Sequence, residues 1–107
     1  MAQNRMTYLQ GKAKKLLKEA KFQFNIAGLT LEPAGSDGRR LDASPGHPHL
    51  LWRVDGTPCD VRLALIWDDP AWRVVLLVDG NSVFQQWVGD GKQLAQYFVP
   101  KITSACP

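Results

Sequence analysis

The residues of this chain that could do chemistry fall into four short groups, and the first two contain histidine or cysteine. The pair His47 and His49 is its only histidine cluster, and Cys59 precedes Asp60. A metal site needs three or four ligands, and no further Cys, His or Asp group supplies the remainder at a recognisable spacing. No histidine is placed by the sequence as a base for Cys59, as nucleophilic catalysis would require. We therefore expect no metal site, no cofactor and no catalytic thiol.

The other two groups have the composition of turns and helix starts. Asp68 and Asp69 precede a proline between two apolar runs, which is typical of a hairpin loop. The glycine-rich residues 89–91 could offer backbone amides to an anion. They lack the lysine and the serine or threonine of a phosphate loop. The sequence therefore predicts a protein that is not an enzyme.

The elements that must position these groups are dominated by residues 50–88. This segment holds four runs rich in β-branched, aromatic and leucine residues, separated by turn-type clusters, and it predicts an antiparallel meander. Pairing Trp67 with Trp72 gives the two central strands one entirely apolar face. A one-residue slip would exchange the faces, so the pattern favours this register. We expect all four tryptophans on the apolar face, with Trp87 opposite Trp72, as part of the core.

The opposite face of the predicted sheet mixes arginines with apolar side chains. Its candidate partner-binding residues are Arg53, Arg62, Arg73, Phe84 and Gln86. This mixture is too apolar for a plain solvent surface, and arginine beside aromatic side chains suits macromolecular recognition. Three interpretations stay open: a protein interface that includes homodimer formation, a nucleic-acid surface, or partial cover by the loop 33–49.

A basic amphipathic helix is predicted before the sheet. Thr7 with Gln10 forms a capping-box pattern that would open a helix over residues 6–21. Its apolar positions fall within an arc of about 100°. The opposite side carries Lys12, Lys14, Lys15, Lys18 and Lys21. Residues 1–21 have a net charge of +5 and the remainder −2, so this helix is either a solvated surface or a binding surface for an anionic partner.

The remaining segments complete the predicted order of elements. Strict alternation and a phase change at Gly28 predict an edge strand or small hairpin over residues 22–32, with a bulge or tight bend at the glycine. Residues 33–49 form a long glycine- and proline-rich loop, either functional or without fixed structure. A second capping box predicts a helix over residues 90–99, which the following proline should end or kink, leaving residues 100–107 as a tail.

Length and composition indicate one α+β domain. The chain has 107 residues, 45% of them hydrophobic and 21% charged, as in ordinary globular domains. No apolar run approaches the roughly 18 residues of a membrane span, so no membrane partner is expected, and the polar N-terminus does not resemble a signal peptide. The two cysteines, Cys59 and Cys106, favour reduced thiols in a cytoplasmic (intracellular) protein, with a bridge between them as the alternative.

The predicted fold is an antiparallel four- to five-stranded β-meander with an N-terminal basic helix and a short C-terminal helix packed on one face. This order is similar to that of double-stranded RNA-binding domains, but residues 91–96 do not match the basic motif with which their last helix begins. We expect a small module that binds another protein or protein complex, like adaptors and inhibitors, including those encoded by phage and other mobile elements. The alternative is a nucleic-acid-binding module that uses the lysines together with Arg39 and Arg40.

Overall fold

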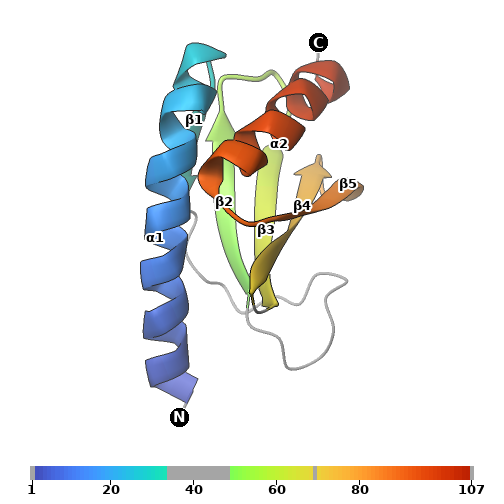
Figure 1. The fold of residues 1–107 in the computed structure, drawn as a ribbon. Coiled ribbons are helices and arrows are strands. Elements are labelled where there is room, and N and C mark those ends of the chain that lie inside the picture. The colour runs from blue at the N-terminus through green and yellow to red at the C-terminus, as the bar shows by residue number, and fades with distance from the viewer. Residues whose placement is uncertain (1, 34–48, 69, 107) are drawn as a thin grey trace.

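The computed structural model describes residues 2–33, 49–68 and 70–106. In this part of the chain two helices and five strands follow one another, and the strands form one antiparallel sheet in the order β1-β2-β3-β4-β5. Both helices lie on the same face of the sheet (Figure 1). The predicted α+β class, the meander and the placement of the helices are therefore confirmed.

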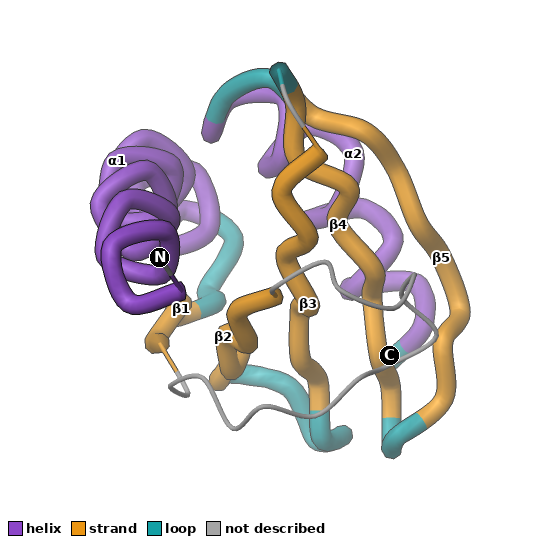
Figure 2. Tube along the Cα trace, turned by 90° about the horizontal axis from the view of Figure 1, so that it is seen from below, coloured by secondary structure: helices purple, strands orange, loops and turns teal. Residues whose placement is uncertain are grey.

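The elements differ from the predicted segments mainly at the two helices. Their bounds are α1, Ala2–Ile26; β1, Thr30–Pro33; β2, His49–Asp55; β3, Val61–Asp68; β4, Ala71–Val78; β5, Asn81–Val88; and α2, Gly91–Ala105. Viewed from below, α1 runs beside β1 at one edge of the sheet, and α2 lies behind β4 and β5 (Figure 2). Most of the predicted loop 33–49 lies outside the described residues.

Helix α1 begins at Ala2, so the capping box predicted at Thr7 and Gln10 is wrong, and the helix also extends past its predicted end and replaces the strand expected there. Its buried positions are spaced by three or four residues, and they are Leu9, Ala13, Leu16, Ala20 and Phe24. The alternation of Phe22, Phe24 and Ile26 predicted a strand, which was wrong. Only Phe24 faces the core, whereas Phe22 and Ile26 are 65% and 67% exposed, as helical geometry requires.

Gly28 forms a tight bend, one of the two predicted alternatives, but the bend ends α1 instead of shifting a strand. Its φ of +82° lies in the left-handed region that glycine adopts without steric cost. The Gly28 N–H donates to the Asn25 carbonyl, and the Leu29 N–H donates to the Phe24 carbonyl. These two bonds define a Schellman motif, and Leu29 packs into the core beside Phe24. The edge strand predicted over residues 22–32 is therefore reduced to the short strand β1.

The central register is the predicted one. Trp67 pairs with Trp72 across the β3–β4 hairpin, and their rings meet edge to face with centroids 5.1 Å apart. Between β2 and β3, Arg53 lies directly opposite Arg62. The apolar face of these strands packs against both helices, and Leu63 is among its fully buried side chains.

Strand β5 departs from the predicted register. Asp79 and Gly80 have φ values of 51° and 85°, as in the type I′ turn that suits a two-residue hairpin. The ladder then shifts at a bulge between Leu76 and Leu77 of β4, so that Leu76 pairs with Phe84. An extra residue on one strand reverses the facing of every residue beyond it.

The bulge therefore exchanges the two faces of β5 relative to the prediction. Trp72 pairs with Val88, and Trp87 lies on the side away from the helices. The predicted row of three tryptophans across three strands is wrong, and the helix-bearing face carries three tryptophans rather than four. Phe84 and Gln86 lie on the helix-bearing face instead of the arginine-bearing one.

Helix α2 begins as predicted and continues beyond its predicted end. The Asp90 side chain accepts the Gln93 N–H at 2.9 Å, which is the expected N-cap. The helix passes through Pro100, and the tail predicted over residues 100–107 is wrong, because Ile102 is fully buried. An interior proline costs about 3 kcal/mol, and burial of one isoleucine offsets about 1.5–3 kcal/mol of that.

The two cysteines, expected to be reduced, form a disulfide. Cys106 caps α2, Cys59 lies in the β2–β3 turn, and their Cα atoms are 6.1 Å apart, within the usual span of a bridge. Thr57 Oγ1 donates to the Cys59 carbonyl and closes this turn. Because the cytoplasmic location was inferred from reduced thiols, the cysteines do not support it, and it stays a prediction.

Candidate binding surface on the arginine face

The sheet surface on the side away from both helices is called the arginine face below. Strand alternation places on it Arg53, Arg62, Arg73, Gln85 and Trp87. Arg53 pairs with Arg62, and Arg73 pairs with Trp87. Leu77, which faces Arg62, is four residues from Arg73 along β4, or about 13 Å. The three predicted arginines therefore share one face but do not form one cluster. Arg53 and Arg62 lie together, whereas Arg73 lies apart from them, beside Trp87.

A small apolar cluster lies between the two pairs. Its members are Leu51, Ala64, Ile66, Val75 and Leu77, and all are buried. The sheet separates this cluster from the main core under the helices. Because these side chains are already buried in the single chain, they belong to its own packing, and the large exposed apolar side chain that this face offers is that of Trp87.

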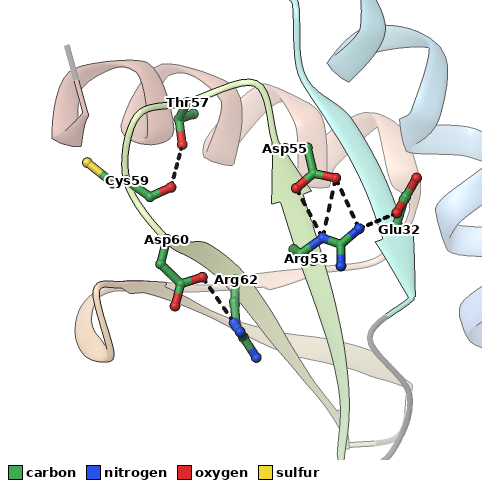
Figure 3. A network of polar contacts seen from close by, with 7 residues as sticks. All are labelled: Glu32, Arg53, Asp55, Thr57, Cys59, Asp60 and Arg62. Atoms are coloured by element: carbon green, nitrogen blue, oxygen red, sulfur yellow. Dashed lines mark hydrogen bonds and ion pairs between the residues drawn. The ribbon is translucent and has the colours of Figure 1, made fainter.

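The first pair is held by carboxylates of the chain itself. Arg53 Nε donates to Asp55 Oδ1 at 3.0 Å, and its Nη2 donates to Glu32 on the neighbouring strand β1 (Figure 3). The hydrogen bond to Asp55, and then the charges of Asp55 and Glu32, raise the pKa of the Arg53 guanidinium above its ordinary value. Arg53 is therefore a cation bonded to carboxylates of the chain itself.

Arg62 has a carboxylate partner as well. Its Nε donates to Asp60 Oδ1 at 3.1 Å (Figure 3). Arg53 and Arg62 are ion-paired to three carboxylates, those of Glu32, Asp55 and Asp60, which equal in number the three arginines of the face. The face is close to neutral overall, which disfavours a polyanion as its ligand.

The second pair combines a cation with an exposed aromatic side chain. Trp87 is 48% exposed, although an indole is among the largest apolar groups a protein can bury. Arg73, opposite it, is half-buried, and its Nη1 reaches Gln85 Oε1 only at 3.5 Å. Tryptophan and arginine are the residue types most enriched at the energetic centres of interfaces. Arg73 and Trp87 are therefore the strongest candidate anchor of the arginine face.

Two predicted partner-binding residues do not belong to this face. The ring of Phe84 meets that of Phe98 in α2 at 5.2 Å between centroids, and Lys101 Nζ lies 5.0 Å from the Phe84 ring. Phe84 therefore belongs to the packing of α2 on the sheet, and Gln86 shares its side. Placing either residue at the arginine face was wrong, because the bulge in β5 reverses them.

Sequence reasoning missed Gln85 and Trp87 at this face. The only signal was a break in alternation, since residues 83–88 contain apolar pairs on either side of a glutamine pair. With such doublets, either set of alternate side chains could point toward the helices. The bulge, rather than the pattern, decides between the two facings.

A second candidate surface lies on α1. Four of its predicted lysines are exposed, and these four are called the lysine stripe: Lys14, Lys15, Lys18 and Lys21. Lys12 is different, because its Nζ lies 4.6 Å above the ring of Trp67 and the residue is half-buried. The structure thus divides the five predicted lysines between a contact with the sheet and an outer surface.

The lysine stripe is not balanced by a free acid on the same helix. Glu19, the acidic residue of α1, accepts the Gly91 N–H at 3.1 Å and so serves the contact between the helices. Phe22 and Ile26 are exposed one and two turns beyond Lys18. The exposed side of α1 is therefore basic along the lysine stripe and apolar near the C-terminal end of the helix. Arg39 and Arg40, predicted to join it, lie outside the described residues.

The amides that could have bound an anion before α2 are used within the protein. The Gly89 N–H donates to Gln93 Oε1 at 2.7 Å, and the Gly91 N–H donates to Glu19. Among residues 2–33, 49–68 and 70–106, no group of three His, Cys, Asp or Glu side chains could hold a metal ion. No helix in the same ranges is long and apolar enough to cross a membrane.

Comparison with protein-family models, curated proteins and solved structures found no match for this chain. The two surfaces themselves therefore carry the information on function.

Proposed function

We propose that this protein is a small non-enzymatic module that binds another protein or protein complex, of the adaptor or inhibitor type, through the arginine face. The observation that supports this most is the half-exposed Trp87 paired with Arg73. An exposed aromatic anchor beside arginine, on a face whose charges are balanced, suits a protein partner better than a nucleic acid.

The basic helix contributes to the same function by attracting the partner electrostatically before contact. The lysine stripe lies on α1, at the β1 side of the molecule, whereas Trp87 lies on β5 at the opposite edge. A partner with an acidic surface would be attracted over a distance of about 10 Å at moderate salt and then anchored by short-range contacts. Loss of the lysines should slow association, whereas loss of Trp87 should speed dissociation.

The proposal is tested by comparing partners recovered with the wild type and with Trp87→Ala from cells that produce the protein naturally. Gln96→Ala, at an exposed position of α2 on the opposite side of the sheet, is the matched control. We expect one defined partner with the wild type and the control, bound about 30-fold more weakly by Trp87→Ala. Equal binding by both variants would rule out the arginine face as the binding surface.

A nucleic-acid-binding module is the second candidate, and the exposed lysine stripe favours it. Four lysines in contact with phosphates would give a slope near −3.6 for the logarithm of affinity against the logarithm of salt concentration, or about −0.9 for each contact. The test is binding to labelled duplex and single-stranded nucleic acids at several salt concentrations. Lys15→Gln combined with Lys18→Gln should then reduce the slope by about two, and an unchanged slope would exclude the stripe.

A further inference from the structure

The two edges of the sheet are built differently. At one edge, β1 has only four residues, ends at Pro33 and carries Glu32, which is ion-paired to Arg53. Helix α1 packs beside this edge strand (Figure 2). Short length, proline and charge are the devices by which proteins prevent pairing at a sheet edge.

At the other edge, β5 has none of these devices. The strand runs for eight residues and contains neither a charged residue nor a proline. Figure 2 shows β5 as the outermost described element on its side, with α2 behind the sheet rather than beyond its edge. The part from Phe84 to Val88 pairs with β4 without irregularity, so its outer side presents a straight row of backbone donors and acceptors.

We propose that β5 pairs in antiparallel fashion with β5 of a second copy of this chain, joining two five-stranded sheets into one. A two-fold axis at Gln86, perpendicular to the sheet, would bring Phe84 of each copy opposite Val88 of the other. Such an axis keeps each face continuous, because residues of equal parity meet. Both helix layers would then share one side, and both arginine faces the other.

The chemistry of the strand favours a second copy as the occupant. The eight residues of β5 carry no charge, so two copies meet without like-charge repulsion. In the register above, Gln85 of each copy lies beside Trp87 of the other, and this contact would cover indole surface that is 48% exposed in the single chain. The inference does not rest on the proposed function, because its premise is the unprotected edge of β5, although Gln85 and Trp87 also belong to the arginine face.

The experiment is the mass in solution over a concentration series, with opposite charges introduced at Gln85. This side chain is exposed, and in the paired strands the two copies of it would lie within about 7–8 Å of each other. Gln85→Lys and Gln85→Glu are each measured alone and then mixed in equal amounts. Gln96→Lys is the matched control, because it adds the same charge at an exposed site on α2.

The proposal predicts that the wild type and the control approach twice the chain mass of 11.9 kDa as concentration rises. The dissociation constant of the Gln85→Lys dimer should be at least about fivefold higher than that of the wild-type dimer. The mixture with Gln85→Glu should recover the dimer. A wild type that stays monomeric throughout would overturn the proposal. A dimer that Gln85→Lys leaves unchanged would do the same, because it would form elsewhere on the molecule.

Discussion

Reduction of the Cys59–Cys106 bridge should remove a large part of the stability of this protein. The two cysteines are 47 residues apart and join the C-cap of α2 to the β2–β3 turn. In the chain-entropy model a loop of this length restricts the unfolded chain by about 4 kcal/mol at 25 °C, and measured effects are typically about 2–4 kcal/mol. Domains of this size have a total stability of about 5–15 kcal/mol. The bridge is also expected to hold the last turn of α2, which follows Pro100.

The assay is urea unfolding of the oxidised protein with and without dithiothreitol, followed by far-ultraviolet circular dichroism. We expect the free energy of unfolding to fall by about 2–4 kcal/mol in the reductant. The double variant Cys59→Ser with Cys106→Ser is the control, and its unfolding should not respond to dithiothreitol. The reasoning is refuted if both thiols of the native protein react with an alkylating agent before reduction. It is also refuted if the reductant leaves the free energy of unfolding unchanged.

Three further substitutions test the packing through the same unfolding measurement. In Gly91→Ala the added Cβ would overlap the Glu19 Cβ, so the helices must separate, at a cost of about 1–3 kcal/mol. An unchanged stability would contradict this close approach of the helices. Phe98→Ala removes a fully buried ring and should cost about 3–5 kcal/mol, whereas a loss below about 1 kcal/mol would place the ring outside the core. Gly28→Ala forces a Cβ into a left-handed conformation and should cost about 1 kcal/mol; a gain in stability would contradict the Schellman motif.

The meander could be predicted because its signal is local and repeated. Val61, Leu63 and Leu65 alternate with residues of the other face, and each has an apolar partner on β4. A one-residue slip would bury arginines under the helices and expose leucines. The same logic placed Arg53 opposite Arg62, and the structure confirms it.

The helix ends could not be predicted because tertiary contacts decide them. Phe22, Phe24 and Ile26 alternate as a strand would, yet α1 continues because Phe24 extends its buried stripe. Pro100 is a helix-breaking signal within the sequence. Helix α2 continues past it because Ile102 reaches the core and the next turn is joined to a distant loop by the disulfide.

The candidate site was predicted in part. The three arginines followed from strand alternation, whereas Trp87 depended on a bulge that leaves no clear mark in the sequence. The sequence also did not indicate that the arginine face is close to neutral. Glu32 reaches Arg53 from a strand 21 residues earlier in the chain, so this ion pair exists only after the sheet has formed.

The most direct test of the central claim is site-specific photocrosslinking from position 85, which lies on the arginine face near Trp87 and leaves that anchor intact. A photoreactive phenylalanine analogue would replace Gln85 in one variant and Gln96 in the other, and both would be irradiated in cells that produce the protein naturally. The account predicts one defined adduct with a different protein from position 85 and none from position 96. No such adduct from position 85, or the same adducts from both positions, would contradict binding through the arginine face.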